Sequence, residues 1–273
     1  MSRALILGGS GHLGHALRDR SREGVEVIAA YRSRPIPGGI AFQFENAGAL
    51  PDADVVIGSF PMARRLEGAS ETQIEEAVRA YVGRCGRARI VQLSTDAVFS
   101  GATGLYGERN PVDPTTPYGR AQAAVDAALL KYAANCLIVR TSFIFGWAGG
   151  HFDKRLAPFA RGEKKPSEHR WAGNIFRAPT EVNFLAEAIW RAVERGTEGI
   201  LNVAGPRVSI HDFFVGALEE LGTFEMPPAH EETDVGVARD TSLHTARMQA
   251  ELDLDSREVW EWYRNFMRRR PAA

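Results

Sequence analysis

The sequence predicts an α/β fold in which a doubly wound parallel sheet carries a smaller C-terminal lobe. Short β-rich runs alternate with longer amphipathic stretches through the first half of the chain, and this alternation is typical of a parallel sheet covered by helices. The runs are almost continuously apolar, as expected of strands buried on both faces. The predicted strands are RALILGG, VEVIAAY, IAFQF, ADVVIGSF, ARIVQLS and CLIVRTS.

Helices are predicted where apolar residues recur at intervals of three and four positions. In the first half these are Leu13–Arg22, Glu71–Cys85 and Tyr118–Tyr132, and further on Glu181–Glu194, Ile210–Leu221 and Ser256–Arg269. A further strand is expected at GILNVAG. After Gly146 the pattern loosens into a stretch rich in Gly, Pro, charge and aromatic residues. We therefore expect one domain over 1–146 and a second lobe mainly over 147–273, with later segments returning to the first domain.

Composition excludes several classes of protein. The 273 residues are 44% hydrophobic and 25% charged, with a formal net charge of -1, which predicts a soluble globular chain without a basic face for nucleic acid. Cys85 and Cys136 lack C-x-x-C spacing, and the histidines lack metal-ligand spacing, so we expect a reducing, cytoplasmic location and no metal. No signal peptide or membrane span is expected. The final helix carries an apolar stripe that faces the core or could cover a homodimer contact.

The first predicted strand runs into a glycine-rich turn that opens a helix. Gly9, Gly11 and Gly14 satisfy G-x-G-x-x-G in the sequence GGSGHLGHAL. This context is typical of a Rossmann-like dinucleotide-binding domain, because glycines permit a tight turn and let backbone N–H groups approach a pyrophosphate. The alternative is a turn without a ligand. The predicted cofactor contacts are Gly8, Ser10, Gly11, His12, Leu13 and Gly14, with Ser59 after the fourth strand.

The end of the second predicted strand indicates which dinucleotide is bound. An acidic residue there would bond the ribose hydroxyls of NAD, but the sequence reads AAYRSRP. Arg32 and Arg34 are placed to meet a 2′-phosphate by charge-assisted contacts. NADP(H) is therefore favoured over NAD(H), although both arginines could instead be solvated loop charges.

Several stretches resemble the extended short-chain dehydrogenase/reductase family, and within it the dTDP-4-dehydrorhamnose reductase group of sugar-nucleotide enzymes. They are LSTDAVFSG, PTTPYGRAQ and LIVRTSFIFG, followed by FRAPTEVNFLAEAIWRAV, GILNVAGPRVSIHDF and DTSLHTARMQAEL. The resemblance covers nearly the whole chain. It implies an NAD(P)-binding domain, a substrate-binding lobe, and hydride transfer between NAD(P)H and a nucleotide-linked sugar.

The resemblance also implies catalytic roles. In the family a Ser or Thr polarises the substrate oxygen, a Tyr exchanges the proton, and a Lys one turn after the Tyr holds the nicotinamide ribose. Thr95 and Tyr118 match the first two positions, whereas Gln122 stands at the lysine position. A glutamine can still bond ribose hydroxyls, so we expect Gln122 to take part in both catalysis and cofactor binding. Arg120 points elsewhere on the helix, and Lys131 is too far along it.

Loss of the lysine charge favours one reaction direction. Without a nearby ammonium, the pKa of Tyr118 should lie near its reference value of about 10. A neutral phenol can donate a proton in a ketone reduction but is a poor base for an alcohol oxidation. We therefore predict an NAD(P)H-dependent reductase of a keto group, and of a nucleotide-linked sugar in particular. The alternatives are a dinucleotide-binding regulatory protein without turnover, or a sugar-nucleotide epimerase or dehydratase.

The substrate is expected outside the carboxyl ends of the strands, between the two lobes. Arg177 could pair a diphosphate or form an ordinary surface salt bridge, and Trp147 and Trp171 could stack on a base or only pack. The candidate substrate contacts are Asp96, Phe143, His151, Phe152, Arg177 and Thr180.

Overall fold

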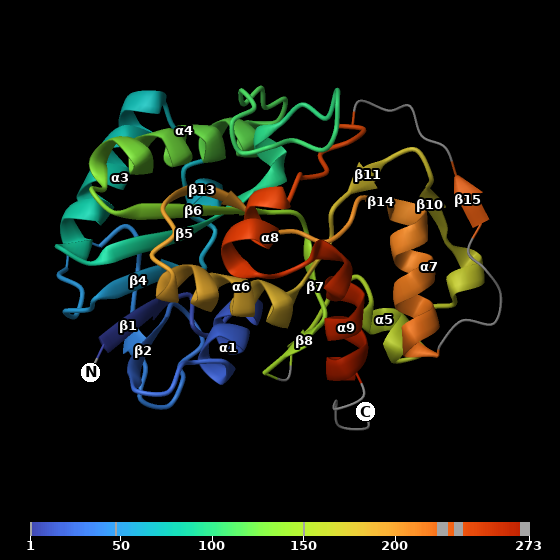
Figure 1. Ribbon diagram of the computed structural model, residues 1–273, viewed down its shortest axis with the longest axis horizontal. Coiled ribbons are helices and arrows are strands. Elements are labelled where there is room, and N and C mark those ends of the chain that lie inside the picture. The colour runs from blue at the N-terminus through green and yellow to red at the C-terminus, as the bar shows by residue number, and fades with distance from the viewer. Residues whose placement is uncertain (1, 47, 150, 223–228, 232–236, 268–273) are drawn as a thin grey trace.

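The computed structural model describes residues 2–46, 48–149, 151–222, 229–231 and 237–267. These residues form a seven-stranded parallel sheet in the order β13-β6-β5-β4-β1-β2-β3 (Figure 1). The strands are β1 (Ser2–Leu7), β2 (Val25–Tyr31), β3 (Ile40–Ala41), β4 (Val55–Gly58), β5 (Arg89–Thr95), β6 (Cys136–Thr141) and β13 (Gly199–Asn202). The predicted doubly wound α/β fold is confirmed. Strand order reverses between β1 and β4, which places a crevice at their carboxyl ends.

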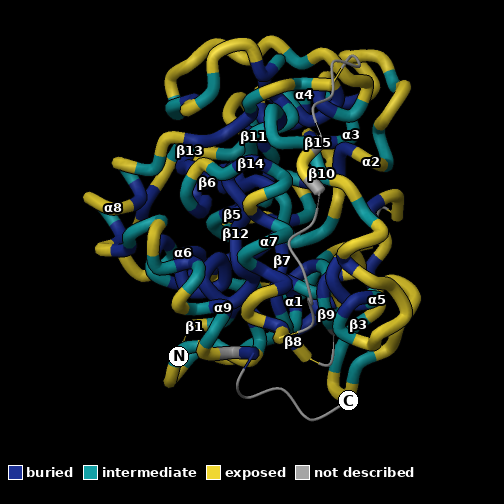
Figure 2. The backbone as a smooth tube through the Cα atoms, turned by 90° about the vertical axis from the view of Figure 1, so that its right-hand side faces the viewer, coloured by how far each residue is buried: buried dark blue, intermediate teal, exposed yellow. Residues whose placement is uncertain are grey.

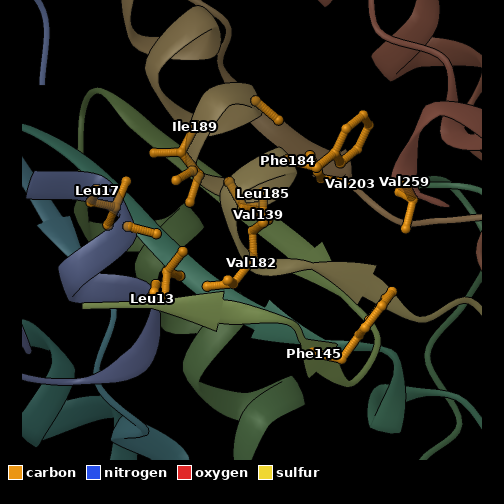
Figure 3. Packing of buried hydrophobic residues seen from close by; sticks show 14 of the residues in the cluster. Leu13, Leu17, Val139, Phe145, Val182, Phe184, Leu185, Ile189, Val203 and Val259 are labelled. Atoms are coloured by element: carbon orange, nitrogen blue, oxygen red, sulfur yellow. The ribbon is translucent and has the colours of Figure 1, made fainter. Parts of the chain in front are cut away.

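Helices cover both faces of the sheet (Figure 1). One face carries α1 (His12–Asp19) and α6 (Val182–Glu194), and the other carries α2 (Met62–Arg65), α3 (Glu71–Cys85) and α4 (Pro117–Tyr132). Successive side chains of β1 point to opposite faces of the sheet. Ala4 and Ile6 pack with α1 and α6, whereas Leu5 and Leu7 pack with α3 and α4. Figure 3 shows Leu13 and Leu17 of α1 facing Ile189 and Leu185 of α6. Figure 2 shows the strands buried at the centre and exposed segments at the periphery.

The remaining elements all follow residue 143, and most of them lie beside the carboxyl edge of the sheet (Figure 1). They are β7 (Ile144–Phe145), β8 (Trp147–Ala148), β9 (His151–Phe152), α5 (Ala157–Ala160), β10 (Arg170–Ala172), β11 (Phe176–Arg177), β12 (Thr180–Glu181), β14 (Val208–Ser209), α7 (Ile210–Leu221), β15 (Ala229–Glu231), α8 (Ala246–Leu252) and α9 (Val259–Met267). Three 3₁₀ turns among the described residues complete the chain: η1 (Asp96–Val98), η2 (Pro166–Glu168) and η3 (Ser256–Glu258).

The core of this part of the chain includes Phe145, which packs against Phe213 of α7 and Tyr263 of α9. Val259, Tyr263 and Met267 are buried, so the apolar stripe of the last helix faces the core.

Local signals in the sequence explain where the main helices begin. The Ser70 hydroxyl accepts from Gln73 N, and the Gln73 side chain accepts from Ser70 N, which forms a capping box at α3. At α4 the Thr116 hydroxyl accepts from Gly119 N, and Pro117 occupies the first turn. The buried carboxylate of Glu181 accepts from the backbone of Asn183 and Phe184 and so caps α6. Glu181, predicted as the first residue of this helix, is its cap.

Several elements differ from the sequence-based expectation, and α1 for example ends at Asp19 rather than at the predicted Arg22. The third strand pairs only over Ile40–Ala41 rather than throughout IAFQF. The last helix begins with the turn η3, and its predicted end at Arg269 lies outside the described residues. Helix α8 was not predicted, because its seven residues bury only Met248 and Leu252 and give too short a periodic signal. Within the described part of the chain, every helix is too short or too polar to span a bilayer.

A charged cluster ties the end of α1 to α6. The Glu187 carboxylate accepts from Arg20 at 3.2 Å, from both terminal nitrogens of Arg22 at 3.1 Å and from Arg191 at 2.9 Å. Partial burial opposes ionisation, but the hydrogen bonds from Arg22 and Arg191 and the charge of Arg22 outweigh it and lower the pKa of Glu187 to about 2. The cluster therefore stabilises the contact between two helices that lie far apart in sequence.

The stability of the protein should depend on this cluster in acid. Because the folded-state pKa of Glu187 is depressed, its contribution is present above the unfolded pKa of about 4.5 and is lost as pH falls toward about 2. We expect Glu187→Gln to lower the free energy of unfolding by about 2 kcal/mol at pH 7, and by much less at pH 3. Glu194→Gln is the matched control, because Glu194 is 50% exposed and pairs Arg22. Urea titrations at both pH values measure the difference, and equal losses at pH 7 and pH 3 would contradict the assignment.

Candidate active site

The glycine turn, residues 8–14, lies at the point where the strand order reverses. Gly8 N and Gly9 N both donate to Ala30 O, at 3.2 and 2.7 Å, which folds the turn back onto β2. Gly8 has φ +92°, and a Cβ at Gly14 would stand 2.2 Å from Gly8 O. Gly11 caps α1 without a side chain, so the first-turn N–H groups of this helix have no capping oxygen from it. An anion suits this position because the helix N-terminus carries partial positive charge.

A cavity of about 450 Å³ opens in front of this turn. Five predicted cofactor residues line it, namely Gly8, Ser10, Gly11, Arg32 and Ser59, together with Arg34, Arg64, Arg65 and the aromatic residues Tyr31, Phe42, Phe44 and Phe60. We call it the glycine-turn cavity. Leu13 instead packs in the core, so only its backbone can meet a ligand, and His12 and Gly14 belong to the first turn of α1. The aromatic and arginine lining fits a nucleotide, which has both flat rings and phosphates.

A larger hollow of about 660 Å³ lies along α3 and α4, lined mainly by alanine, proline and charged side chains. It contains neither Thr95 nor Tyr118. None of the predicted cofactor residues lines this hollow, whereas five of them line the glycine-turn cavity, so we place the candidate active site at the glycine turn.

Thr95 and Tyr118 are brought together by a close approach of α4 to the end of β5. A Cβ at Gly119 would stand 2.1 Å from Ala97 O, so only glycine lets the first turn of α4 reach η1. The Thr95 hydroxyl donates to Asp96 Oδ1 at 3.1 Å and accepts from Ala97 N at 3.2 Å. It also contacts the Tyr118 hydroxyl. The two residues predicted to be catalytic thus lie side by side at the carboxyl edge of the sheet.

Asp96, predicted as a substrate contact, is buried behind Thr95. Its Oδ2 accepts from the Ser142 and Thr241 hydroxyls, each at 2.8 Å. Burial raises the pKa of Asp96, and the bonds from Ser142 and Thr241 act against that rise. In this arrangement Asp96 fixes the Thr95 hydroxyl.

The environment of Tyr118 keeps it protonated at neutral pH. Burial raises the pKa of Tyr118 above its ordinary value, the positive charge of Arg64 opposes that rise, and the negative charge of Asp96 adds to it. The guanidinium of Arg64 lies over the phenol ring, with Cζ 4.1 Å from the ring centroid. A protonated phenol beside the Thr95 hydroxyl can donate a proton to an oxygen placed between them.

Gln122 lies one turn after Tyr118 and is 3% exposed. Its Nε2 donates to Asp126 Oδ1 at 2.9 Å. Asp126 is also buried and accepts from the Ser94 hydroxyl at 2.8 Å, with Arg140 Nε at 3.5 Å. The amide group is thus engaged with Asp126, and the contact of Gln122 with a cofactor ribose stays a prediction.

The other substrate candidates lie along the C-terminal lobe. Phe143 packs on Phe213 and under the guanidinium of Arg155. Arg177 donates to the carbonyls of Phe176 and Ala238, and desolvation lowers its pKa despite the negative charge of Asp96. Thr180 is fully buried and bonded to Thr141, so it faces the core.

Three further residues give weaker indications. Trp171 stacks on Phe214 with ring centroids 4.6 Å apart, and Trp147 packs near Phe152. The backbone of His151 lies in β9, but its side chain is outside the described residues.

Comparison with known proteins places these features in one family. Residues 63–261 match the family model described as RmlD substrate binding domain. The chain belongs to this family. The matched residues include α4 and most of the second half, so the RmlD family relationship covers Thr95, Tyr118 and Gln122. The predicted membership in a family of sugar-nucleotide reductases within the extended short-chain dehydrogenase/reductases is confirmed.

Individual relatives agree with this family. The spore coat polysaccharide biosynthesis protein SpsK of Bacillus subtilis is 27% identical, covering 81% of this chain and 80% of that protein. The dTDP-4-dehydrorhamnose reductase of Aggregatibacter actinomycetemcomitans is 28% identical, covering 81% and 79%. A solved structure of a hypothetical dTDP-4-dehydrorhamnose reductase from Sulfolobus tokodaii is 29% identical, with a TM-score of 0.74 and coverage of 93% and 96%.

Solved structures at lower identity share the fold and contain dinucleotides. The dTDP-4-dehydrorhamnose reductase of Bacillus anthracis in complex with NADP is 17% identical, with a TM-score of 0.73 and coverage of 96% and 98%. MoeE5 in complex with UDP-glucuronic acid and NAD is 21% identical, with a TM-score of 0.72 and coverage of 98% and 99%. Both likenesses show that this chain shares its fold with these dinucleotide complexes.

Sequence reasoning missed four residues of this site: Arg64, Asp126, Ser142 and Thr241. Arg64 follows β4, whose end adjoins that of β1 in the sheet. The adjacent pair Arg64 and Arg65 could have indicated a positively charged group near the glycine turn. Thr241 had none, because it reaches Asp96 from 145 positions away in sequence.

Proposed function

We propose that this protein is an NADPH-dependent reductase of the C4 keto group of a dTDP-linked sugar, such as dTDP-4-dehydrorhamnose. The observation that carries the proposal is the pairing of Tyr118 with Thr95 at the carboxyl edge of the sheet, beside the glycine-turn cavity. The names of the RmlD-family relatives support the same reaction and substrate class.

The reaction needs a hydride at carbon and a proton at oxygen. The reduced nicotinamide supplies the hydride when bound. Gly8, Ser10 and Gly11 would hold its diphosphate at the N-terminus of α1. Tyr118 gives its proton to the oxygen that becomes the alcohol and is left as a phenolate, which takes a proton from solvent. The Thr95 hydroxyl, which is held by its hydrogen bond to Asp96, provides a second polar group beside that oxygen.

The direct test follows NADPH oxidation by the purified protein with dTDP-4-dehydrorhamnose. We expect turnover that depends on the keto sugar and yields the 4-hydroxy product. Cofactor binding without oxidation, for this substrate and for other dTDP-linked 4-keto sugars, would overturn the proposal.

A second candidate function is a dinucleotide-binding regulatory protein without turnover. The observation that favours it is Gln122, whose amide is engaged with Asp126 instead of supplying a charge beside Tyr118. Gln122→Lys separates the two candidates. The second is supported if the native protein binds NADPH without oxidising it and the substitution creates activity, and the first is supported if the native protein already turns over.

The preference for NADP(H) rests on Arg32 and Arg34, which both line the glycine-turn cavity. An arginine pairs a 2′-phosphate bidentately. We expect Arg32→Ala to weaken NADPH binding about 10- to 100-fold and to leave NADH binding within about threefold. Arg120→Ala is the matched control, since Arg120 carries the same charge outside this cavity. Titrations monitored by protein fluorescence give the six dissociation constants, for three proteins and two cofactors. Equal affinity for both cofactors in the native protein and in Arg32→Ala would contradict the 2′-phosphate assignment.

Three further predictions complete the proposal. The NAD(P)-binding domain spans 1–146, with β13 and α6 returning to it, and the substrate-binding lobe lies mainly within 147–273. The protein is cytoplasmic. A homodimer is the remaining prediction, although the apolar stripe of α9 that suggested it faces the core, and light scattering would test it.

A further inference from the structure

The position one turn after Tyr118 carries no charge in this chain, because Gln122 stands there. We propose that Arg64, on a different helix, supplies the positive charge that acts on Tyr118 during proton transfer. This inference rests on the proposed function, because it assigns a role within the same site. Arg64 acts through Tyr118 and is an electrostatic positioning residue.

Helix α2 fixes the backbone of Arg64, whose side chain is 58% exposed. Its neighbours Met62 and Ala63 are buried at 1% and 0% exposure in the layer between the sheet, α3 and α4. The guanidinium lies over the Tyr118 ring at 4.1 Å from the centroid, and Nη1 donates to Glu67 at 3.2 Å. Arg64 also lines the glycine-turn cavity, so the group stands between the catalytic tyrosine and the predicted cofactor site.

A cation over the ring face favours the phenolate form of tyrosine. Electron density on the ring rises when the phenol loses its proton, so the attraction to the guanidinium becomes stronger. Other charges near Tyr118 act in the opposite direction. Burial and the carboxylates of Asp96 and Asp126 raise the pKa of Tyr118, whereas Arg64 and the Thr95 hydroxyl lower it. Arg64 therefore offsets the two carboxylates as the proton leaves.

The cations of α4 are directed elsewhere. Arg120 donates to the carbonyl of Thr115, and Lys131 pairs Glu75 near the end of the helix. Neither is among the main causes that shift the pKa of Tyr118. Among the described residues on α2 and α4, Arg64 is the cation in contact with the tyrosine ring.

The structure also allows a different role for Arg64, because a guanidinium that lines the cavity could pair a phosphate of the dinucleotide. The two roles differ in a measurable way. A partner of the cofactor changes the affinity for NADPH and leaves the ionisation of Tyr118 in the free protein unaltered. A charge that acts on Tyr118 shifts that ionisation without any cofactor present.

The test replaces Tyr118 in the full-length protein by 3,5-difluorotyrosine, whose phenol ionises at lower pH than that of tyrosine. Titration followed by fluorine NMR then reports a single phenol in the cofactor-free protein. We expect Arg64→Met to raise the pKa of this phenol by about 0.5 to 1 unit and Arg64→Lys to leave it near the native value. Arg79→Met is the matched control, because Arg79 lies over the ring of Tyr132 instead, at 5.8 Å, and should not move the signal.

A rescue variant distinguishes the loss of the Arg64 charge from a structural effect of the substitution. In the Arg64→Met background, Gln122→Lys places an ammonium one turn from Tyr118 and should return the phenol pKa toward the native value. An unchanged pKa in Arg64→Met overturns the inference, whether or not NADPH affinity falls. A rise in pKa that Arg64→Lys also produces overturns it too, because packing rather than charge would then be the cause.

Turnover provides an independent readout. Reduction requires protonated Tyr118, so the rate falls as pH rises through its pKa. Arg64→Met should move this alkaline limb to higher pH while lowering kcat on the plateau about tenfold, since the phenolate formed in the reaction loses its partner charge. A lower plateau with an unmoved limb contradicts the inference. Absence of keto-sugar reduction in the native protein would instead overturn the proposed function. The NMR titration would still test whether the charge of Arg64 acts on Tyr118.

Discussion

Replacing Tyr118 by phenylalanine is expected to lower kcat for keto-sugar reduction by about a hundredfold or more, because positioned general acids contribute factors of this size. The phenol contacts the Thr95 hydroxyl at the carboxyl edge of the sheet and stays protonated at neutral pH. Phenylalanine keeps the ring under the guanidinium of Arg64 and removes only the oxygen. The loss should therefore appear in kcat, with NADPH affinity changed by less than about threefold.

Tyr132→Phe is the matched control for this substitution. Tyr132 lies at the far end of the same helix, where its hydroxyl donates to Glu75, so its removal should leave kcat within about twofold. Stopped-flow measurement of NADPH oxidation with saturating keto sugar gives the rate of the chemical step. If Tyr118→Phe retains full activity, the proton comes from another group and the proposed mechanism fails.

Gly14→Ala is expected to have the largest effect on stability and on cofactor binding together. A Cβ at Gly14 would stand 2.2 Å from Gly8 O and 2.7 Å from Gly9 Cα. These are backbone atoms of the turn itself, which cannot rotate away as a side chain can. We expect a loss of about 3 kcal/mol or more in the free energy of unfolding, and no measurable NADPH binding.

Gly83→Ala provides the control, because Gly83 lies within α3 and a Cβ there meets nothing within 4 Å. Replacing an exposed helical glycine by alanine should stabilise the protein by up to about 1 kcal/mol. Urea unfolding of both variants, with NADPH titrations at equal protein concentration, measures the contrast. A Gly14→Ala protein with native stability and affinity would show that the turn opens more easily than its backbone contacts indicate.

Most of the fold could be predicted from the sequence because its elements carry strong local signals. Helix α3 begins and ends at the predicted residues, since Ser70 and Gln73 form a capping box and Gly86 follows the last turn. The central strands are apolar throughout and could be recognised without knowledge of their neighbours. The short strand pairs of the C-terminal lobe could not, because pairs of two residues such as β7 and β12 exist only through contacts between distant segments.

Site residues could be predicted where they belong to one sequence motif. They could not be predicted where several distant segments meet. Thr95 and Tyr118 each lie in a recognisable stretch, and the glycine turn has a fixed position after β1. Arg64 and Thr241 reach the same site from other parts of the chain, and their roles depend on contacts made in three dimensions. Gln122 shows a further limit, because the sequence identified the missing lysine but not that the glutamine amide bonds to Asp126.

The position of α6 determines when the first half of the chain can fold. Trp190 of α6 donates from its indole to Leu17 O of α1 at 2.9 Å, and β13 pairs along the outer edge of β6. During synthesis on the ribosome, the glycine turn emerges long before either of these elements. Until residue 202 has emerged from the ribosome, the apolar side of α1 and the outer edge of β6 lack these partners. We therefore expect shorter nascent chains to expose apolar surface and an unpaired strand edge, which favours aggregation or chaperone binding over nucleotide binding.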